Sequence, residues 1–264
     1  MPVIDSHCHV SPTWYEPAEV LLFQMDRNGV DGAILIQMKG QANNDYQTEC
    51  LRRYPGRFAS VVVIDEKQTD APRVLERLAE QGASGVRIGP SERSPGDDPL
   101  AIWHTAERLG LSVSCGGRAS DFAAPEFRSL VQALPNLSIV IEHLGNLNHP
   151  THASDERLRE TVFGLAHFPN VYIKIHGLGE FSERAIPVKD PFPFRQPIPS
   201  LLQQAYETFG PRRMMWGSDY PPVSGREGYR NALRLTLEQF ANTSREDRGE
   251  IFGGTALRVF PIRQ

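Results

Sequence analysis

The chain has 264 residues, with 28 Lys and Arg against 32 Asp and Glu and a formal net charge of −4. This balance leaves no basic surface for nucleic acid or for an anionic membrane. No apolar run is long enough to span a bilayer and no signal-peptide pattern opens the chain, so the expected partner is a small-molecule substrate.

The three cysteines are Cys8, Cys50 and Cys115. Their number is odd and they lack Cys-x-x-Cys spacing, which argues against a disulfide framework. We therefore expect a cytoplasmic protein, because free thiols persist in a reducing compartment.

Short apolar runs alternate with segments of helical periodicity along the whole chain. The runs are short and continuous, which is typical of strands buried on both faces. The expected strands are residues 3–10, 31–37, 58–65, 85–89, 111–116, 137–143, 171–177 and 214–219. The expected helices are residues 16–28, 44–54, 71–81, 100–109, 125–134, 155–168, 200–209, 228–241 and 246–252.

Strands that alternate with helices are parallel and joined by helical crossovers. Eight such units in a chain of this length predict one closed (β/α)8 barrel, a TIM barrel, with residues 1–264 as a single domain. No Gly-x-Gly-x-x-Gly follows the first strand, which disfavours a doubly wound dinucleotide-binding sheet.

The first strand carries a His-x-His pattern at His7 and His9. Side chains alternate along a strand, so both imidazoles point to one face, and Asp5 shares that face. Two imidazoles on one face form half of a divalent-metal site. Because such a pair also arises by chance, the other strands must supply its partners.

Active sites of such barrels form where the strands end at the C-terminal face. The polar residues expected there on the later strands are Arg87, Cys115, His143, Lys174, His176 and Asp219. Ionisable groups are costly to bury unless they are paired or bind a metal, so this set indicates a functional site.

Alternation orients the seventh strand. Residues 171, 173 and 175 are apolar and suit the helix-facing side, so Lys174 and His176 face the barrel axis. On the sixth strand either face suits the lumen, and His143 is preferred to Glu142 because it completes the constellation.

Pro221 ends the eighth strand just after Asp219, which places Asp219 at the mouth of the barrel. A carboxylate there can bind a metal, act as general base toward water, or do both. The alternative is an aspartate that only stabilises a turn.

Five segments together carry a family resemblance. They are VIDSHCH (3–9), PNLSIVIEHLG (135–145), NVYIKIHGL (170–178), RMMWGSDYP (213–221) and IFGGTALRVF (251–260). In this order they resemble the amidohydrolase superfamily, and within it the branch of sugar lactonases, pyrone-dicarboxylate lactonases and relatives of aminocarboxymuconate semialdehyde decarboxylases. The resemblance implies a distorted (β/α)8 barrel with one metal or, in some lactonases, none.

The resemblance also implies roles for single residues. His7 and His9 match the first-strand metal pair, and His143 matches the sixth-strand histidine. Asp219 matches the aspartate that activates water, and Arg87 matches an arginine that holds substrate oxygens. We therefore expect Asp219 and His143 to be catalytic and His7, His9 and Asp219 to bind the metal.

Two departures from the family pattern bear on the metal. The histidine that many metal-dependent members carry on strand five is replaced by Cys115, which is either a zinc ligand or a core residue. The carboxylated lysine that binuclear members carry on strand four has no counterpart, because Arg87 stands there. We expect one divalent ion, zinc, with a metal-independent lactonase as the alternative.

Further residues are expected near the site. His176 and Arg118 are interpreted as substrate contacts, although His176 could instead satisfy a buried neighbour. Lys174 is expected to pair with an acid such as Asp5, and Cys8 to pack outward against the helices.

Loops complete the expected mouth. Trp14 and Tyr15 could wall the pocket, and the proline-rich loop at 179–199 is interpreted as a lid, or else as a contact in a homo-oligomer. His149 and His152 are not expected to be ligands.

These residues predict a hydrolase of a small substrate that bears a carboxylate or hydroxyls, most simply a lactonase in which Asp219 activates water. One alternative is a non-oxidative decarboxylase of an aromatic or muconate-type acid that uses the same site. Another is a non-catalytic barrel that only binds a ligand.

Overall fold

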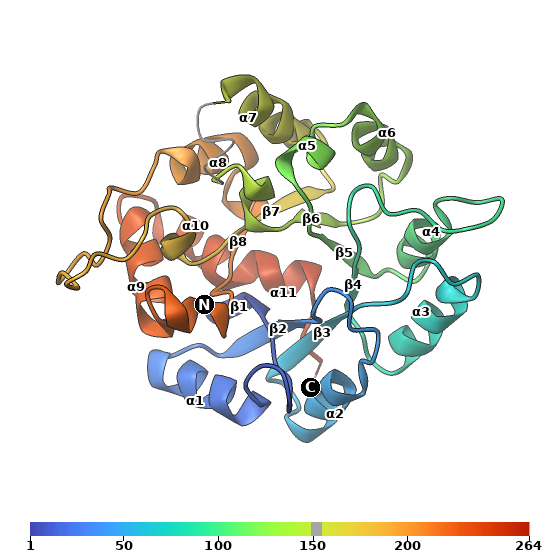
Figure 1. The fold of residues 1–264 in the computed structure, drawn as a ribbon, viewed down its shortest axis with the longest axis horizontal. Coiled ribbons are helices and arrows are strands. Elements are labelled where there is room, and N and C mark those ends of the chain that lie inside the picture. The colour runs from blue at the N-terminus through green and yellow to red at the C-terminus, as the bar shows by residue number, and fades with distance from the viewer. Residues whose placement is uncertain (149–154, 264) are drawn as a thin grey trace.

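The computed structural model describes residues 1–148 and 155–263, so His149 and His152 lie outside the described residues. One sheet of eight parallel strands runs in sequence order from β1 to β8. Figure 1 shows the strands as a ring with the helices outside it. The strands are β1 (Ile4–Cys8), β2 (Gly32–Ile36), β3 (Phe58–Val62), β4 (Gly85–Arg87), β5 (Ser112–Cys115), β6 (Ile139–Ile141), β7 (Val171–Ile175) and β8 (Met214–Trp216). The predicted (β/α)8 barrel is confirmed.

Helices connect the strands, as each parallel crossover requires. They are α1 (Ala18–Asn28), α2 (Asp45–Arg53), α3 (Ala71–Glu80), α4 (Ala101–Arg108), α5 (Ala119–Phe122), α6 (Pro125–Ala133), α7 (Glu156–Phe163), α8 (Leu201–Phe209), α9 (Tyr229–Gln239), α10 (Arg245–Gly249) and α11 (Thr255–Val259). Within the described ranges, no helix has the length and apolar character needed to cross a membrane.

The barrel closes between β1 and the segment that follows β8. The backbone N–H of Asp219 donates to the carbonyl of His7 at 2.9 Å, and the N–H of His9 donates to the carbonyl of Tyr220 at 2.7 Å. Cys8 and Tyr220 pair there in parallel. The first and last strand ends are therefore held side by side at the mouth.

Alternation along the strands separates two apolar layers. On β2, Ala33 and Leu35 pack outward against the helices, whereas Ile34 and Ile36 point into the barrel. The outer layer also contains Cys8 and Cys115, so the packing role predicted for Cys8 is confirmed and Cys115 is a core residue.

The barrel interior is apolar at the end opposite the mouth. Residues of α11 and the segment after it, including Val259 and Phe260, pack against the inward side chains of the strands. Figure 1 shows α11, in red, lying across the ring of strands. The sequence analysis did not predict this helix, because it placed the last helix at 246–252, where α10 runs into a wider π-helical turn (Glu250–Gly254).

Every strand ends one to three residues earlier than expected. β6 and β8 stop at Ile141 and Trp216, before His143 and Asp219. Beyond β6 and β8 the chain leaves the extended conformation, and His143 and Asp219 both have positive φ angles, of 52° and 58°. The C-terminal strand ends thus become loops that carry the site.

Phe260 gives a test of the apolar plug. Phe260→Ala removes a fully buried ring from the barrel interior, and we expect it to lower the free energy of unfolding by about 3–5 kcal/mol. Phe260→Leu should cost less because it keeps most of the packed volume. Denaturant titration of the three proteins checks this, and equal stability of Phe260→Ala and wild type would contradict the packing role.

Candidate active site

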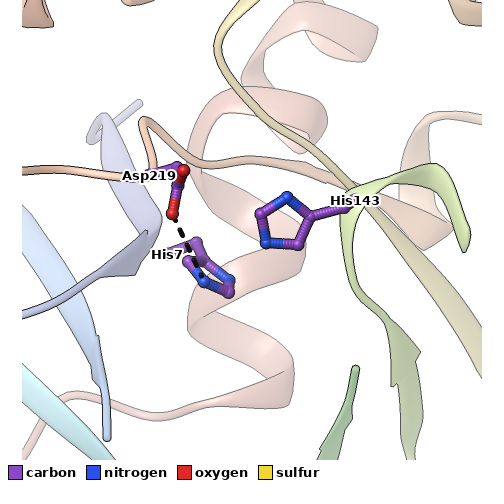
Figure 2. Close-up of side chains that lie close together, drawn as sticks. All are labelled: His7, His143 and Asp219. Atoms are coloured by element: carbon purple, nitrogen blue, oxygen red, sulfur yellow. Dashed lines mark ion pairs between the residues drawn. The ribbon is translucent and has the colours of Figure 1, made fainter. Parts of the chain in front are cut away.

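Asp219 lies at the centre of the mouth, facing three histidines. Its Oδ1 is 3.5 Å from His9 Nε2 and 3.9 Å from His7 Nε2. Figure 2 shows His143 pointing toward the same point from the opposite side. The ligand atoms of His7, His143 and Asp219 all lie within 4.8 Å of one another. Residues from β1 and from the loops after β6 and β8 therefore converge, as the sequence analysis expected.

His7, within β1, and His9, just after its end, differ in how they are held. His9 Nδ1 lies 2.7 Å from the carbonyl of Ile36, so it donates its proton there and leaves Nε2 free toward Asp219. Neither ring nitrogen of buried His7 has a hydrogen-bond partner. Burial, and then the charge of Lys174, hold the pKa of His7 well below its ordinary value, so the imidazole is neutral.

Asp5 does not join this cluster, in contrast to the alternation argument. Its Oδ1 accepts the backbone N–H groups of Ser218 at 2.7 Å and His7 at 3.2 Å. The register of β1 against β2 shifts between Asp5 and Cys8, and this irregularity interrupts the regular alternation on which the prediction rested. Asp5 instead ties β1 to the β8 end.

Glu142 and His143, the two candidates for the lumen-facing residue of the sixth strand, both face the site. β6 ends at Ile141, and Glu142 points inward, where Ser114 Oγ donates to it at 2.7 Å. His143 reaches the mouth because its positive φ turns the chain, and its ring lies 4.9 Å from that of His7. The sequence analysis left the lumen-facing side of this strand open and preferred His143. Glu142 is still extended and shares the inward face of Val140, whereas His143 reaches the site only through its positive φ.

Arg87 at the end of β4 and Glu142 just after β6 form an ion pair, in which Glu142 is buried and Arg87 is part-buried. The Arg87 Nη2 donates to Glu142 Oε2 at 2.7 Å, and its Nε lies 3.1 Å from Oε1. Its Nη1 donates to the carbonyl of Gln37. Although burial opposes ionisation, Arg87 and then Lys174 hold the pKa of Glu142 well below its ordinary value. The charge of Arg87 is thus committed to a protein carboxylate.

Lys174 faces the axis, as predicted, but its partner is not Asp5. Its Nζ donates to Ser114 Oγ at 2.9 Å and lies 5.2 Å from the centre of the Phe260 ring. Burial lowers the pKa of Lys174 to about 8, against the opposing charge of Glu142. Lys174 therefore lies in a polar layer between the apolar plug and the histidines of the mouth.

His176 faces inward but is covered by protein groups. Its Nε2 contacts the Glu180 carboxylate, and its ring packs at 4.1 Å against that of His143. Burial lowers the pKa of His176 to about 4, even though Glu180 opposes this. His176 is 1% exposed and contacts Glu180 and His143, which favours the second interpretation, a residue held among buried neighbours, although neither ring nitrogen forms a hydrogen bond.

The sequence analysis missed Glu180 and Arg226. Glu180 ends the short turn Leu178–Glu180 after β7, and Arg226 follows the turn Pro222–Gly225 after β8. Arg226 donates to Glu180 Oε1 at 2.7 Å and to Asp219 Oδ2 at 3.0 Å. Both lie in loops without strand or helix periodicity, so the one available signal was charge close behind a strand end.

A cavity of about 980 Å³ opens beside the cluster, and His143, Arg87 and Glu142 line it. Arg118 stands at its rim with an exposed side chain, as expected of a substrate contact. Tyr15 stacks on His9 at 5.5 Å, whereas Trp14 is 77% exposed.

The proline-rich loop folds back on itself. Arg184 and Phe194 pair within it, and Phe194 is buried. Arg195 donates to Glu183 at the exposed surface. Of the described loop residues, Glu180 is the one that lines the cavity.

The donor set suits one divalent cation. His7 offers buried nitrogens without partners, and its ligand group is completed by His143 and Asp219. The expected metal set had His9 in place of His143; His9 lies 3.5 Å from Asp219 but is not part of this compact group. Two imidazoles and a carboxylate are a ligand set that zinc accepts, with room left for substrate or water. No ligand group among the described residues includes Cys115, so its role as a ligand is not supported.

An eight-stranded parallel barrel with histidines and an aspartate at its C-terminal mouth defines an enzyme of the amidohydrolase superfamily. The sequence profile of the Amidohydrolase family matches residues 4–262, and the chain belongs to that family.

Three similar proteins illustrate the likeness. The chain is 26% identical over 247 residues to an L-fucono-1,5-lactonase of Burkholderia ambifaria, which covers 89% of the chain and 82% of the relative. It is 26% identical over 197 residues to a 4-sulfomuconolactone hydrolase of Hydrogenophaga intermedia; this covers 73% of the chain but spans 59% of that hydrolase. A zinc-bound crystal structure of an amidohydrolase from Burkholderia multivorans superposes with a TM-score of 0.76 at 20% identity, covering 99% of this chain and all of that one.

The Arg87–Glu142 pair generates a prediction. Arg87→Met leaves a buried carboxylate without its main partner, so we expect a loss of about 3–5 kcal/mol in unfolding free energy. Arg118→Met, at the exposed rim, should change stability by less than about 0.5 kcal/mol and should instead raise KM for acidic substrates. Denaturant titration and kinetics on both variants check this. If Arg87→Met kept wild-type stability but had a raised KM, Arg87 would instead hold substrate oxygens, as the family resemblance implies.

Proposed function

We propose that this protein hydrolyses a small lactone that bears a carboxylate or hydroxyls, with Asp219 as the general base. The observation that carries the proposal is the arrangement around Asp219: Oδ1 faces His7 and His9, whereas Oδ2 is bound by Arg226. One carboxylate oxygen is thus aimed at the point where a reacting water and carbonyl can meet.

In this mechanism the oxygen of the attacking water bonds to the lactone carbonyl carbon, and Asp219 Oδ1 accepts a proton from that water. The ring C–O bond then breaks, and the same proton is returned from Asp219 to the departing ring oxygen. The product is a hydroxy acid, since the leaving group stays attached. The buried mouth strengthens each of these electrostatic contacts relative to water.

His7, His143 and Asp219 would hold the cation, with His9 beside them. When bound, a zinc ion supplies Lewis acidity to the carbonyl oxygen. Without a cation, the charged form of His143, in which both ring nitrogens carry a proton, is placed to donate a hydrogen bond from Nε2 to that oxygen. Burial opposes the charged imidazole, but the hydrogen bond to Glu180 raises the pKa of His143 above its ordinary value, which suits a donor.

We propose that the charge of the substrate is recognised at the rim of the cavity. Arg87 already bonds Glu142, so the exposed Arg118 is the better contact for a substrate carboxylate. Lys39 also lines the cavity, where it pairs with Glu92 at 3.1 Å. An acidic lactone could engage both cations at the entrance.

A decarboxylase would use the same base and the same histidines, so product analysis must separate the two reactions. A panel of lactones and aromatic acids is assayed for ring-opened hydroxy acid and for carbon dioxide. Carbon dioxide release without ring opening would replace the lactonase proposal by the decarboxylase. Tight binding without turnover across the panel would leave only a binding barrel.

Asp219 gives the sharpest test of the base. Asp219→Asn keeps size and shape but cannot accept a proton, so kcat should fall by about 10²- to 10⁴-fold with a smaller change in KM. Asp65→Asn, an exposed aspartate on the cavity rim, is the matched control. Kinetics, melting temperature and metal content are measured together. Near-wild-type turnover in folded Asp219→Asn would remove Asp219 as the base.

Metal dependence is tested separately. Protein purified without added metal should contain about one equivalent or less of a divalent ion, zinc, because His7, His143 and Asp219 form one compact ligand group. Elemental analysis before and after chelation, with activity measured in parallel, checks this. Two equivalents per chain would contradict a single site, and full activity after chelation would assign the metal-independent mechanism.

A further inference from the structure

Arg226 lies behind the site and holds two carboxylates at once. Its Nη2 donates to Asp219 Oδ2 at 3.0 Å, and its Nη1 donates to Glu180 Oε1 at 2.7 Å. The planar guanidinium presents these donors in a rigid fork, so the two carboxylates are fixed relative to each other. The loops after β7 and β8, which carry Glu180 and Arg226, are joined by this contact.

The second oxygen of each carboxylate faces the histidines. Asp219 Oδ1 lies toward His7 and His9, and Glu180 Oε2 lies 3.3 Å from His143 Nδ1. Each carboxylate therefore has an outer oxygen bound by Arg226 and an inner oxygen directed at an imidazole. This division sets which atoms of Asp219 and His143 remain available to a substrate or a metal.

His143 needs such a partner more than the other histidines do. It lies outside β6, in a run of residues with positive φ, so no strand ladder holds its backbone. With Glu180 as acceptor, the proton of the neutral ring sits on Nδ1 and the lone pair on Nε2 faces the mouth. A histidine with the other tautomer would present a proton there instead.

We propose that Arg226 and Glu180 are positioning residues: Arg226 restricts Asp219 to a single working oxygen, and Glu180 fixes the orientation and tautomer of His143. The proposal rests on the proposed function in taking Asp219 and His143 as the working groups. It does not depend on which substrate is hydrolysed, and it applies with or without a cation.

A different use of the same residues is a second cation site, because ligand atoms of His143, His176 and Glu180 also lie within 4.8 Å of one another. Both oxygens of Glu180 already have protein partners, which opposes a second site: Oε1 accepts from Arg226 at 2.7 Å, and Oε2 contacts His143 and His176. We therefore assign positioning to this group.

The experiment compares three variants with controls. Glu180→Gln removes the charged acceptor, Arg226→Lys keeps the positive charge but lacks the fork, and Arg226→Gln removes the charge. Glu183→Gln and Arg234→Gln are the controls, because both residues form ion pairs at the surface away from the mouth. Each protein is examined for histidine tautomers by nitrogen NMR at alkaline pH without metal, for kcat and KM, and for melting temperature. The His143 signals are assigned with His143→Gln.

In wild type and controls we expect the His143 proton on Nδ1. Glu180→Gln should move a large share of it to Nε2 and lower kcat by about 10- to 100-fold, with KM within about 3-fold. Arg226→Lys should lower kcat similarly despite its charge. Near-wild-type activity in Arg226→Lys, together with a large loss in Arg226→Gln, would show that the positive charge alone matters. That result would overturn the role assigned to the forked guanidinium.

Unchanged tautomers in folded Glu180→Gln would overturn the role assigned to Glu180. A loss confined to melting temperature, with kcat kept, would reduce both residues to structural supports and also overturn the proposal. The tautomer is read without substrate, so it separates this inference from the proposed function. The two results can differ. If Glu180→Gln shifts the tautomer of His143 but Asp219→Asn remains active, the positioning of His143 is supported and the role of Asp219 as general base is contradicted.

Discussion

The closure of the barrel between β1 and the β8 end is the interaction on which the site depends. Backbone hydrogen bonds join Asp219 to His7 and His9 to Tyr220, and the Asp5 carboxylate receives the Ser218 N–H. These bonds complete the sheet and in the same step bring the first-strand histidines against Asp219. Residues more than 200 positions apart in the chain thus become neighbours, and fold and site share one set of contacts.

Buried charge is arranged in two levels above the apolar plug. In the lower level Arg87 and Glu142 pair directly, and Ser114 links Glu142 to Lys174. Such a pair is costly to desolvate and is stable only when its remaining hydrogen bonds are satisfied, which these contacts provide. The pair therefore stabilises the floor of the mouth and leaves the chemistry to the level above.

The upper level is organised by the guanidinium of Arg226. Arg226 holds Asp219 and Glu180, and these carboxylates face His7, His9, His143 and His176. Although burial opposes its ionisation, the nearby His176 and the cationic neighbours keep the pKa of Glu180 low, so it stays charged beside His143. Negative charge is thereby kept next to imidazoles in a largely buried region, where such contacts are stronger than in water.

The sequence by itself determined the barrel, the pair His7 and His9, the position of Asp219 at the mouth and the inward direction of Lys174. The barrel, the histidine pair and the direction of Lys174 follow from the two-residue period of strands and the 3.6-residue period of helices, and the position of Asp219 follows from Pro221 behind it; all are local properties of the chain. The tertiary structure alone decided the direction of Glu142 and His143, the partner of Arg87 and the fork of Arg226. Beyond the last ladder bond, side-chain direction depends on backbone angles such as the positive φ of His143, and pairing depends on loops that meet only when the barrel closes.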